Sequence, residues 1–109
     1  MRINKELLKG STVILILSLL KRKEMYGYEI IKELEVRSSG LFNFKEGTLY
    51  PILHTLEKNE LVSSFWSEGE NSRKRKYYKI TKKGNNQLRE KSDEWKLFSS
   101  TVNKITLED

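Results

Sequence analysis

Residues 73–81 read RKRKYYKIT, in which four consecutive cations precede an alternating pattern with two tyrosines. Such alternation is typical of a β-strand. A second strand-like run covers residues 61–66, and the polar residues 68–72, which include a glycine, are typical of a turn. Together the three segments predict a basic β-hairpin. Charge of this density on a strand indicates a surface that contacts a polyanion.

The composition of the whole chain also favours an acidic partner. Its 109 residues suffice for one domain, and 21 Lys and Arg against 15 Asp and Glu give a net charge of +6. The absence of cysteine excludes disulfides and thiolate metal sites and fits a cytoplasmic protein. Because a hydrophobic content of 37% is lean, we expect a partner subunit to complete the apolar packing.

The longest apolar run, Val13–Leu20, predicts a buried helix over residues 5–22. The run is far shorter than the roughly 20 residues that span a membrane, so no membrane partner is expected. A helix that is apolar on all sides is buried on all sides. We therefore expect one side to meet the domain and another side to meet a second subunit. A short β-strand is the alternative.

Two further helices are predicted by apolar residues at helical spacing. The first covers residues 28–37 and is followed by Gly40, a natural left-handed cap. Gly27, just before it, indicates a tight turn or a close backbone contact. The second covers residues 47–59, and its apolar stripe consists of Leu49, Ile52, Leu53 and Leu56.

The outward face of the 47–59 helix is a candidate for the DNA major groove. Its candidate contact residues are Thr48, Tyr50, Pro51, His54 and Lys58. The hydroxyls suit phosphates or base edges, the proline suits a thymine methyl, and the lysine suits the backbone. The single histidine is a poor metal ligand, so no metal is expected. A plain surface helix is the alternative.

In the hairpin, Tyr78 and Ile80 are predicted on one face of the second strand, with Tyr77 and Lys79 on the other. The candidate phosphate contacts are the cations Arg73, Lys74, Arg75 and Lys76. Phosphate contacts give affinity without sequence choice. The alternative is a solvated strand edge whose cations prevent aggregation.

The C-terminal segment predicts a helix that packs along another helix. Thr81 is a good N-cap, and the lysines of the following turn oppose the helix dipole, so nearby phosphates would justify them. Beyond this turn, apolar residues recur with a heptad period at Leu88, Trp95, Phe98, Val102 and Ile105, with one interruption at Lys91. Such a seam is typical of a coiled coil and indicates a homodimer.

A helix followed by a basic hairpin is the layout of a winged helix on DNA. The expected fold is mainly α with a small β-hairpin wing (α+β). We assign residues 1–80 to a winged helix-turn-helix domain and residues 81–109 to a dimerisation helix.

Three segments resemble the PadR family of bacterial transcriptional regulators, in its short subgroup with one C-terminal helix. YGYEI (26–30) is similar to the family's second helix, and GTLYPIL (47–53) to the start of its recognition helix. RKYYKITKKG (75–84) is similar to its wing strand, RxYYxLTxxG. The resemblance covers residues 7–105. The family usually places glycine before the leucine that starts the wing, where this chain has Glu60 before Leu61. We expect Asn59 to take the left-handed cap instead.

The resemblance implies a homodimeric repressor that binds an inverted repeat in double-stranded DNA and senses phenolic acids or planar drugs, as a multidrug regulator does. Trp95 either fills the dimer core or stacks a flat aromatic ligand between two symmetry-related indoles. Nearby acidic residues favour a cationic ligand. The resemblance places Ile14 and Ser18 in the same space, with Phe98 at the interface.

The sequence contains no Gly-rich phosphate loop, metal-spaced cluster or plausible catalytic triad. We therefore expect neither an enzyme nor a cofactor. The alternative function is a winged-helix module that docks on a protein, or that binds DNA without any effector.

Overall fold

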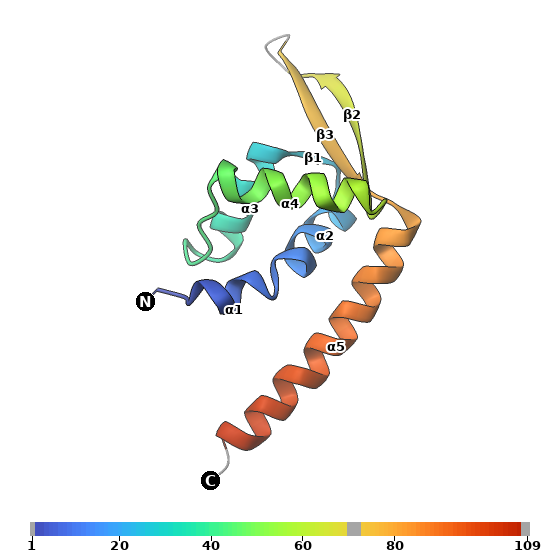
Figure 1. The fold of residues 1–109 in the computed structure, drawn as a ribbon. Helices are drawn as coiled ribbons and strands as arrows, with labels where there is room; N and C mark the ends of the chain where they lie inside the picture. Colours follow the sequence, from blue (N-terminus) through green and yellow to red (C-terminus); the bar gives the residue numbers. More distant parts are fainter. Residues whose placement is uncertain (1, 70–72, 108–109) are drawn as a thin grey trace.

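The computed structural model describes residues 2–69 and 73–107, and this part of the chain contains five helices and three strands (Figure 1). The helices are α1 (Lys5–Lys9), α2 (Thr12–Arg22), α3 (Gly27–Arg37), α4 (Glu46–Lys58) and α5 (Lys82–Thr106). The strands are β1 (Met25–Tyr26), β2 (Val62–Glu68) and β3 (Lys74–Ile80). A mainly α fold with a small antiparallel sheet is thereby confirmed.

The single helix predicted over residues 5–22 is wrong, because the chain breaks between α1 and α2. The hydroxyls of Ser11 and Thr12 both donate to the carbonyl oxygen of Leu8, at 3.1 and 2.9 Å. Such side-chain bonds compete with the helical ladder, and the preceding Gly10 is a poor helix former. The apolar run itself is helical, which rules out the alternative of a strand.

The sheet has the order β1-β3-β2, and all its pairings are antiparallel. The wing, defined here as the β2–β3 hairpin, stands away from the helices at the top of Figure 1. Its register runs from Val62 opposite Ile80 to Glu68 opposite Lys74. The predicted hairpin is confirmed, although residues 70–72 of the predicted turn lie outside the described residues.

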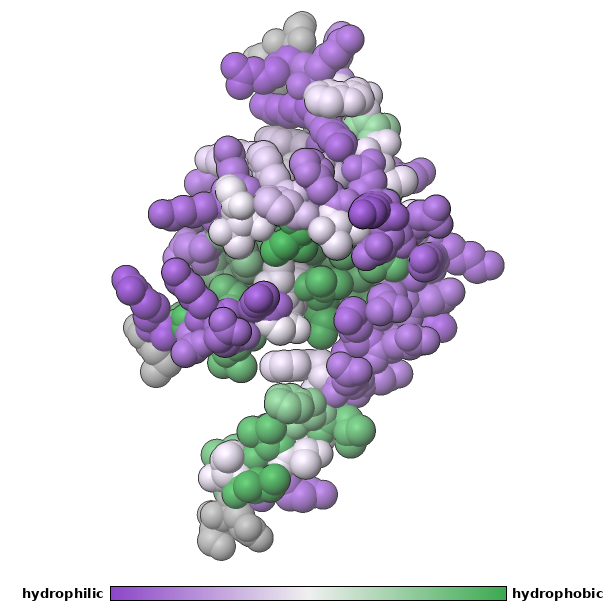
Figure 2. Space-filling model, in the orientation of Figure 1, coloured by the Kyte–Doolittle hydropathy of each residue, from purple (hydrophilic) through white to green (hydrophobic). Residues whose placement is uncertain are grey.

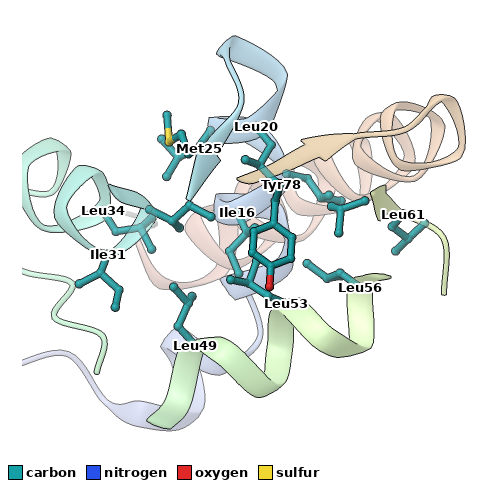
Figure 3. Close-up of a cluster of buried hydrophobic side chains, with 14 of the residues drawn as sticks. Ile16, Leu20, Met25, Ile31, Leu34, Leu49, Leu53, Leu56, Leu61 and Tyr78 are labelled. Atoms are coloured by element: carbon teal, nitrogen blue, oxygen red, sulfur yellow. The ribbon is translucent and has the colours of Figure 1, made fainter. Parts of the chain in front are cut away.

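The hydrophobic core lies between α2, α3, α4 and the base of the sheet (Figure 3). Figure 3 shows side chains from α2, α4 and β3 pointing toward one another: Ile16, Leu49, Leu53 and Tyr78. The α4 stripe is buried as predicted, except that Ile52 is only partly buried. On α2 the burial is one-sided, because Val13, Ile14 and Leu15 remain half-buried in the single chain.

Left-handed backbone occurs at two helix ends. Gly40 has φ +82° after α3, as predicted, and its neighbour Ser39 has φ +54°. After α4 the left-handed residue is Glu60, with φ +63°, whereas Asn59 has φ −85°. The prediction for Asn59 is wrong by one residue, because α4 continues to Lys58 before the chain turns.

Helix α5 extends far beyond the other elements, and with it the protein measures 58 × 32 × 21 Å along its principal axes. Only Gly84 and Leu88 of this helix are buried. Figure 2 shows apolar side chains gathered on its C-terminal half, whereas polar side chains cover most of the wing. Among the described residues, none of the helices combines the length and the apolar character needed to cross a membrane.

Candidate nucleic-acid interface

Helix α4 presents a polar face that runs along its exposed side. Thr48, Pro51, His54 and Lys58 are all exposed, while the leucines of the same helix are buried. Pro51 lies inside the helix, so the carbonyl of Gly47 receives no helical hydrogen bond from it. Four of the five predicted contact residues therefore share one accessible face.

Tyr50, the fifth predicted residue, lies on the flank of α4 and packs against α3. A Cβ atom added to Gly27 would lie 2.5 Å from ring atom Cε1 of Tyr50, so only glycine leaves room for this ring. Burial, with smaller contributions from Glu46 and Tyr78, raises the pKa of the Tyr50 hydroxyl. The hydroxyl therefore remains protonated at neutral pH and available as a donor. Gly27 was expected at a tight turn or a close backbone contact, and the close contact that the structure shows is with the Tyr50 side chain.

The four wing cations occupy three different environments. Arg73 and Lys74 are exposed, and within the described ranges neither forms an ion pair. The Arg75 guanidinium lies 4.5 Å from the ring centroid of Tyr26. The Lys76 Nζ atom lies 3.2 Å from Glu57 Oε1 and 5.3 Å from the ring centroid of Tyr78. The run is therefore not a uniform row of solvated charges.

Glu57 links α4 to the wing through two partners. Its carboxylate accepts hydrogen bonds from the Ser64 hydroxyl and from Lys76. The bond from Ser64 is the main cause that lowers the pKa of Glu57; burial opposes the shift, and Lys76 adds to it. Burial alone would lower the pKa of Lys76, but Glu57 and Tyr78 raise it overall. Glu57 thus joins α4 to the wing through one hydrogen bond and one ion pair.

Replacing Glu57 with glutamine should destabilise the protein only where the carboxylate is ionised. Because its pKa is depressed in the fold, Glu57 contributes stability above the pKa of about 4.3 of an unfolded chain. That contribution is lost as the pH falls through the folded value. Both side chains are about one-third exposed, so we expect less than about 1 kcal/mol.

Urea unfolding of wild type and Glu57→Gln measures this effect. The two midpoints should differ at about pH 7, and the difference should shrink as the pH falls below about 4.3. The raised pKa of Lys76 keeps the pair charged up to at least about pH 10.4, so no second convergence is expected below that pH. A difference in midpoint that is equal at pH 3 and pH 7 would contradict the role of the carboxylate.

The face of the sheet opposite to that of Tyr78 carries a row of aromatic rings. The Phe65 and Tyr77 rings stack at 5.6 Å with an interplanar angle of 16°. The Tyr26 ring meets the edge of Tyr77 at 5.5 Å. Since these three residues come from three strands, the row ties the short β1 to the wing and fixes the ring on which Arg75 lies.

Thr81 alone separates β3 from α5, and it is hydrogen-bonded on several sides. Its backbone N–H donates to the Leu61 carbonyl at 3.1 Å, and its hydroxyl donates to the Glu60 carbonyl at 2.7 Å. The same hydroxyl oxygen accepts the Gly84 N–H at 2.9 Å, which confirms the predicted N-cap. Lys83 donates to the Asn59 carbonyl at 3.0 Å. This lysine of the first turn therefore has a partner within the fold.

Two of the predicted effector residues lie together on α5. The rings of Trp95 and Phe98 are 6.1 Å apart and tilted by 35°. With Ile14 they line a groove of about 320 Å³, the α5 groove, whose rim includes Lys91 and Glu94. Ser18 lines a different groove, between α2 and α5, with Arg22 and Arg89 among its neighbours. The single chain thus brings together three of the four predicted residues.

Among the residues that the structure describes, no group of acidic, histidine or cysteine side chains could hold a metal ion. Sequence reasoning did not single out Tyr26, Glu57 and Trp66, which the structure places beside the predicted wing residues Arg75 and Lys76. Trp66 is 67% exposed, and its position in the alternating run 61–66 is the one signal that could have placed it on the same face as Tyr78.

Comparisons with known proteins agree on one family. The model of the transcriptional regulator PadR-like family matches residues 16–90. An uncharacterized protein of Lysinibacillus sphaericus is 37% identical over 93 residues, which is 85% of each chain. A transcriptional regulator from Clostridium thermocellum superposes with a TM-score of 0.85 and 36% identity over 94% of this chain and 99% of its own. A PadR-like transcriptional regulator from Bacillus cereus gives a TM-score of 0.85 and 34% identity, over 96% and 99%.

Proposed function

Because this chain belongs to the PadR-like family of transcriptional regulators, we propose that it is a homodimeric repressor that binds an inverted repeat and is released by a small aromatic ligand. As regulators of transcription, members of the family are not enzymes. The observation that carries the proposal is the fixed arrangement of the exposed α4 face beside the basic wing. The wing and α4 together form a surface suited to one half-site of double-stranded DNA.

On this proposal, α4 lies in the major groove and the wing contacts the backbone. Thr48, Pro51 and His54 read base edges and thymine methyls, and Lys58 contacts phosphate. Arg73 and Lys74 contact flanking phosphates without sequence choice. Lys76, already paired with Glu57, contributes less to phosphate binding than its neighbours do.

The uncovered apolar stripe of α5 supports the homodimer. Trp95 is 42%, Phe98 56% and Ile105 71% exposed, although all three lie on the heptad seam. A second copy of the chain would cover the stripe by packing of α5 against its partner. Residues 81–109 would then hold two recognition helices about one DNA turn apart, roughly 34 Å.

The α5 groove supports the effector. Trp95 offers an indole face for a flat aromatic molecule, and the apolar Phe98 and Ile14 complete the apolar wall. Glu94 on the rim favours a positive charge on the ligand. A ligand relieves repression only if it binds better to the dimer arrangement that cannot engage DNA.

Titration with planar aromatic compounds tests the effector directly. The Trp66→Phe variant leaves Trp95 as the only tryptophan of the chain. We expect a saturable loss of its fluorescence with at least one compound of a panel of planar aromatic cations and aromatic carboxylates. Calorimetry with the same compound should show at least about tenfold weaker binding to Trp95→Ala, because base-like stacking on an aromatic ring is worth about 1–3 kcal/mol.

The control is Leu97→Ala. Leu97 is 71% exposed, and helical spacing places it on the side of α5 away from the stripe. This variant should bind the compound as the wild type does. If no compound in the panel changes the fluorescence, the effector part fails, and a regulator that binds DNA without an effector remains.

A further inference from the structure

A small groove separates the wing from α3 and α4. It encloses about 230 Å³ and is lined by Tyr26, Gly27, Tyr50, Trp66, Arg75, Lys76 and Tyr78. We call it the wing–helix groove. Its volume is below the range of about 300–1,000 Å³ that holds a free small ligand. It is better suited to one segment of a larger molecule that continues beyond it.

Arg75 is prepared for an anion in this groove. Its guanidinium lies over the Tyr26 ring, with Cζ 4.5 Å from the ring centroid. The guanidinium is a planar fork of five N–H donors whose geometry matches the oxygens of a phosphate. Because stacking restricts the side chain, less conformational entropy is lost when an anion binds.

The Trp66 indole forms an apolar wall of the wing–helix groove, and its exposure to water is unfavourable. It lies opposite Lys76 in the register of the hairpin and is 67% exposed. Lys76 is held by Glu57, with its Nζ atom 3.2 Å from the carboxylate. The groove therefore combines an exposed indole, a stacked guanidinium and the protonated Tyr50 hydroxyl. A ligand that joins an anionic group to a ring with an apolar face would contact all three of these groups.

We propose that the wing–helix groove holds one phosphate and the adjoining deoxyribose of the DNA backbone. Arg75 and the Tyr50 hydroxyl bind the phosphate, and the Trp66 indole packs on the sugar. Tyr26 is a positioning residue that holds Arg75 in place. The inference rests on the proposed DNA-binding function. It adds Trp66 and Tyr26 to the interface and gives Tyr50 a phosphate beside α4.

Charge-matched variants test the phosphate contact with a mixed-sequence duplex about two helical turns long. Arg75→Ala and Lys79→Ala each remove one charge from β3, but Lys79 lies outside the groove. We expect Arg75→Ala to weaken binding about tenfold more than Lys79→Ala does, because a charge-assisted hydrogen bond is lost. Trp66→Ala should weaken binding at least about fivefold, because an indole has a large contact area.

A double-mutant cycle tests the positioning role of Tyr26. Tyr26→Phe keeps the ring and should bind DNA as the wild type does. Tyr26→Leu should weaken binding, and adding it to Arg75→Ala should cause little further loss. Additive losses would show that Tyr26 acts independently of Arg75 and would overturn this role.

Trp66 fluorescence separates failure of this inference from failure of the proposed function. In the Trp95→Phe variant, Trp66 is the only tryptophan, and the duplex should change its emission in a saturable way. If the wild type binds no duplex, the proposed function itself fails. If the wild type binds duplex, but Trp66 emission stays constant and Arg75→Ala matches Lys79→Ala, only the wing–helix groove is overturned.

Discussion

Gly84→Ala should lower the free energy of unfolding by about 3 kcal/mol or more, at the upper end of the effects of overpacking. A Cβ atom added to Gly84 collides with the carbonyl oxygen of Leu61, and it would lie 3.0 Å from the Leu61 carbonyl carbon and 2.8 Å from Ile80 Cγ1. Backbone cannot rotate away as a flexible side chain can. The same shift would break the N-cap bond between Gly84 and Thr81.

Thermal unfolding followed by circular dichroism measures this effect. A loss of 3 kcal/mol corresponds to a fall in Tm of roughly 10–20 °C for a domain of this size. The control is Gly47→Ala, the same substitution in a helix at a position where an added Cβ meets nothing within 4 Å. This variant should be neutral or slightly stabilised, because alanine favours a helix over glycine. Equal Tm values for the two variants would contradict the close packing of α5 on Leu61.

The triple variant with alanine at Arg73, Lys74 and Arg75 should bind every DNA sequence more weakly. Each lost phosphate contact reduces the slope of log K against log salt by about 0.9, so the slope should fall by about 2.7 for each wing and by about 5.4 for a dimer with both wings on DNA. At about 0.1 M salt this corresponds to a loss of about 10²–10³-fold in affinity for each wing. The preference between sequences should remain, because α4 is unchanged.

Fluorescence anisotropy with labelled duplexes at several salt concentrations gives both slope and affinity. The control variant carries alanine at Arg89, Lys96 and Lys104, three cations of α5 that helical spacing places away from the apolar stripe. It removes the same charge from a region remote from the wing, so only a small change of slope is expected. If the wing variant keeps the wild-type slope, the wing does not contact phosphates.

Local patterns in the sequence predicted the features that local chemistry determines. The alternation at residues 73–81 predicted β3, the leucine spacing predicted the buried face of α4, and the hydroxyl of Thr81 predicted the start of α5. Each depends on residues a few positions apart. The break at Gly10 was missed because the apolar run beside it has strong helical spacing, which conceals the local bonds of Ser11 and Thr12.

Contacts between distant segments were beyond sequence reasoning. Glu57 meets Ser64 and Lys76 only because α4 crosses the base of the wing. The pairing of β1 with β3 places Tyr26 beside Tyr77, and a strand of two residues carries no periodic signal. Sequence reasoning therefore treated the cations of residues 73–76 as four equivalent groups, although the structure gives them different partners and different exposure.

The single residue between β3 and α5 has a mechanical consequence. Thr81 is hydrogen-bonded both to the residues that precede β2 and to the first turn of α5. The wing and α5 therefore move together as one rigid unit. The seven residues of β3 span about 23 Å at roughly 3.3 Å per residue. A rotation of this rigid unit by about 10° about Thr81 would therefore displace the wing tip by about 4 Å, more than the reach of a hydrogen bond of about 3 Å. In the proposed dimer, a small rotation between the two α5 helices is sufficient to take the wings off the DNA.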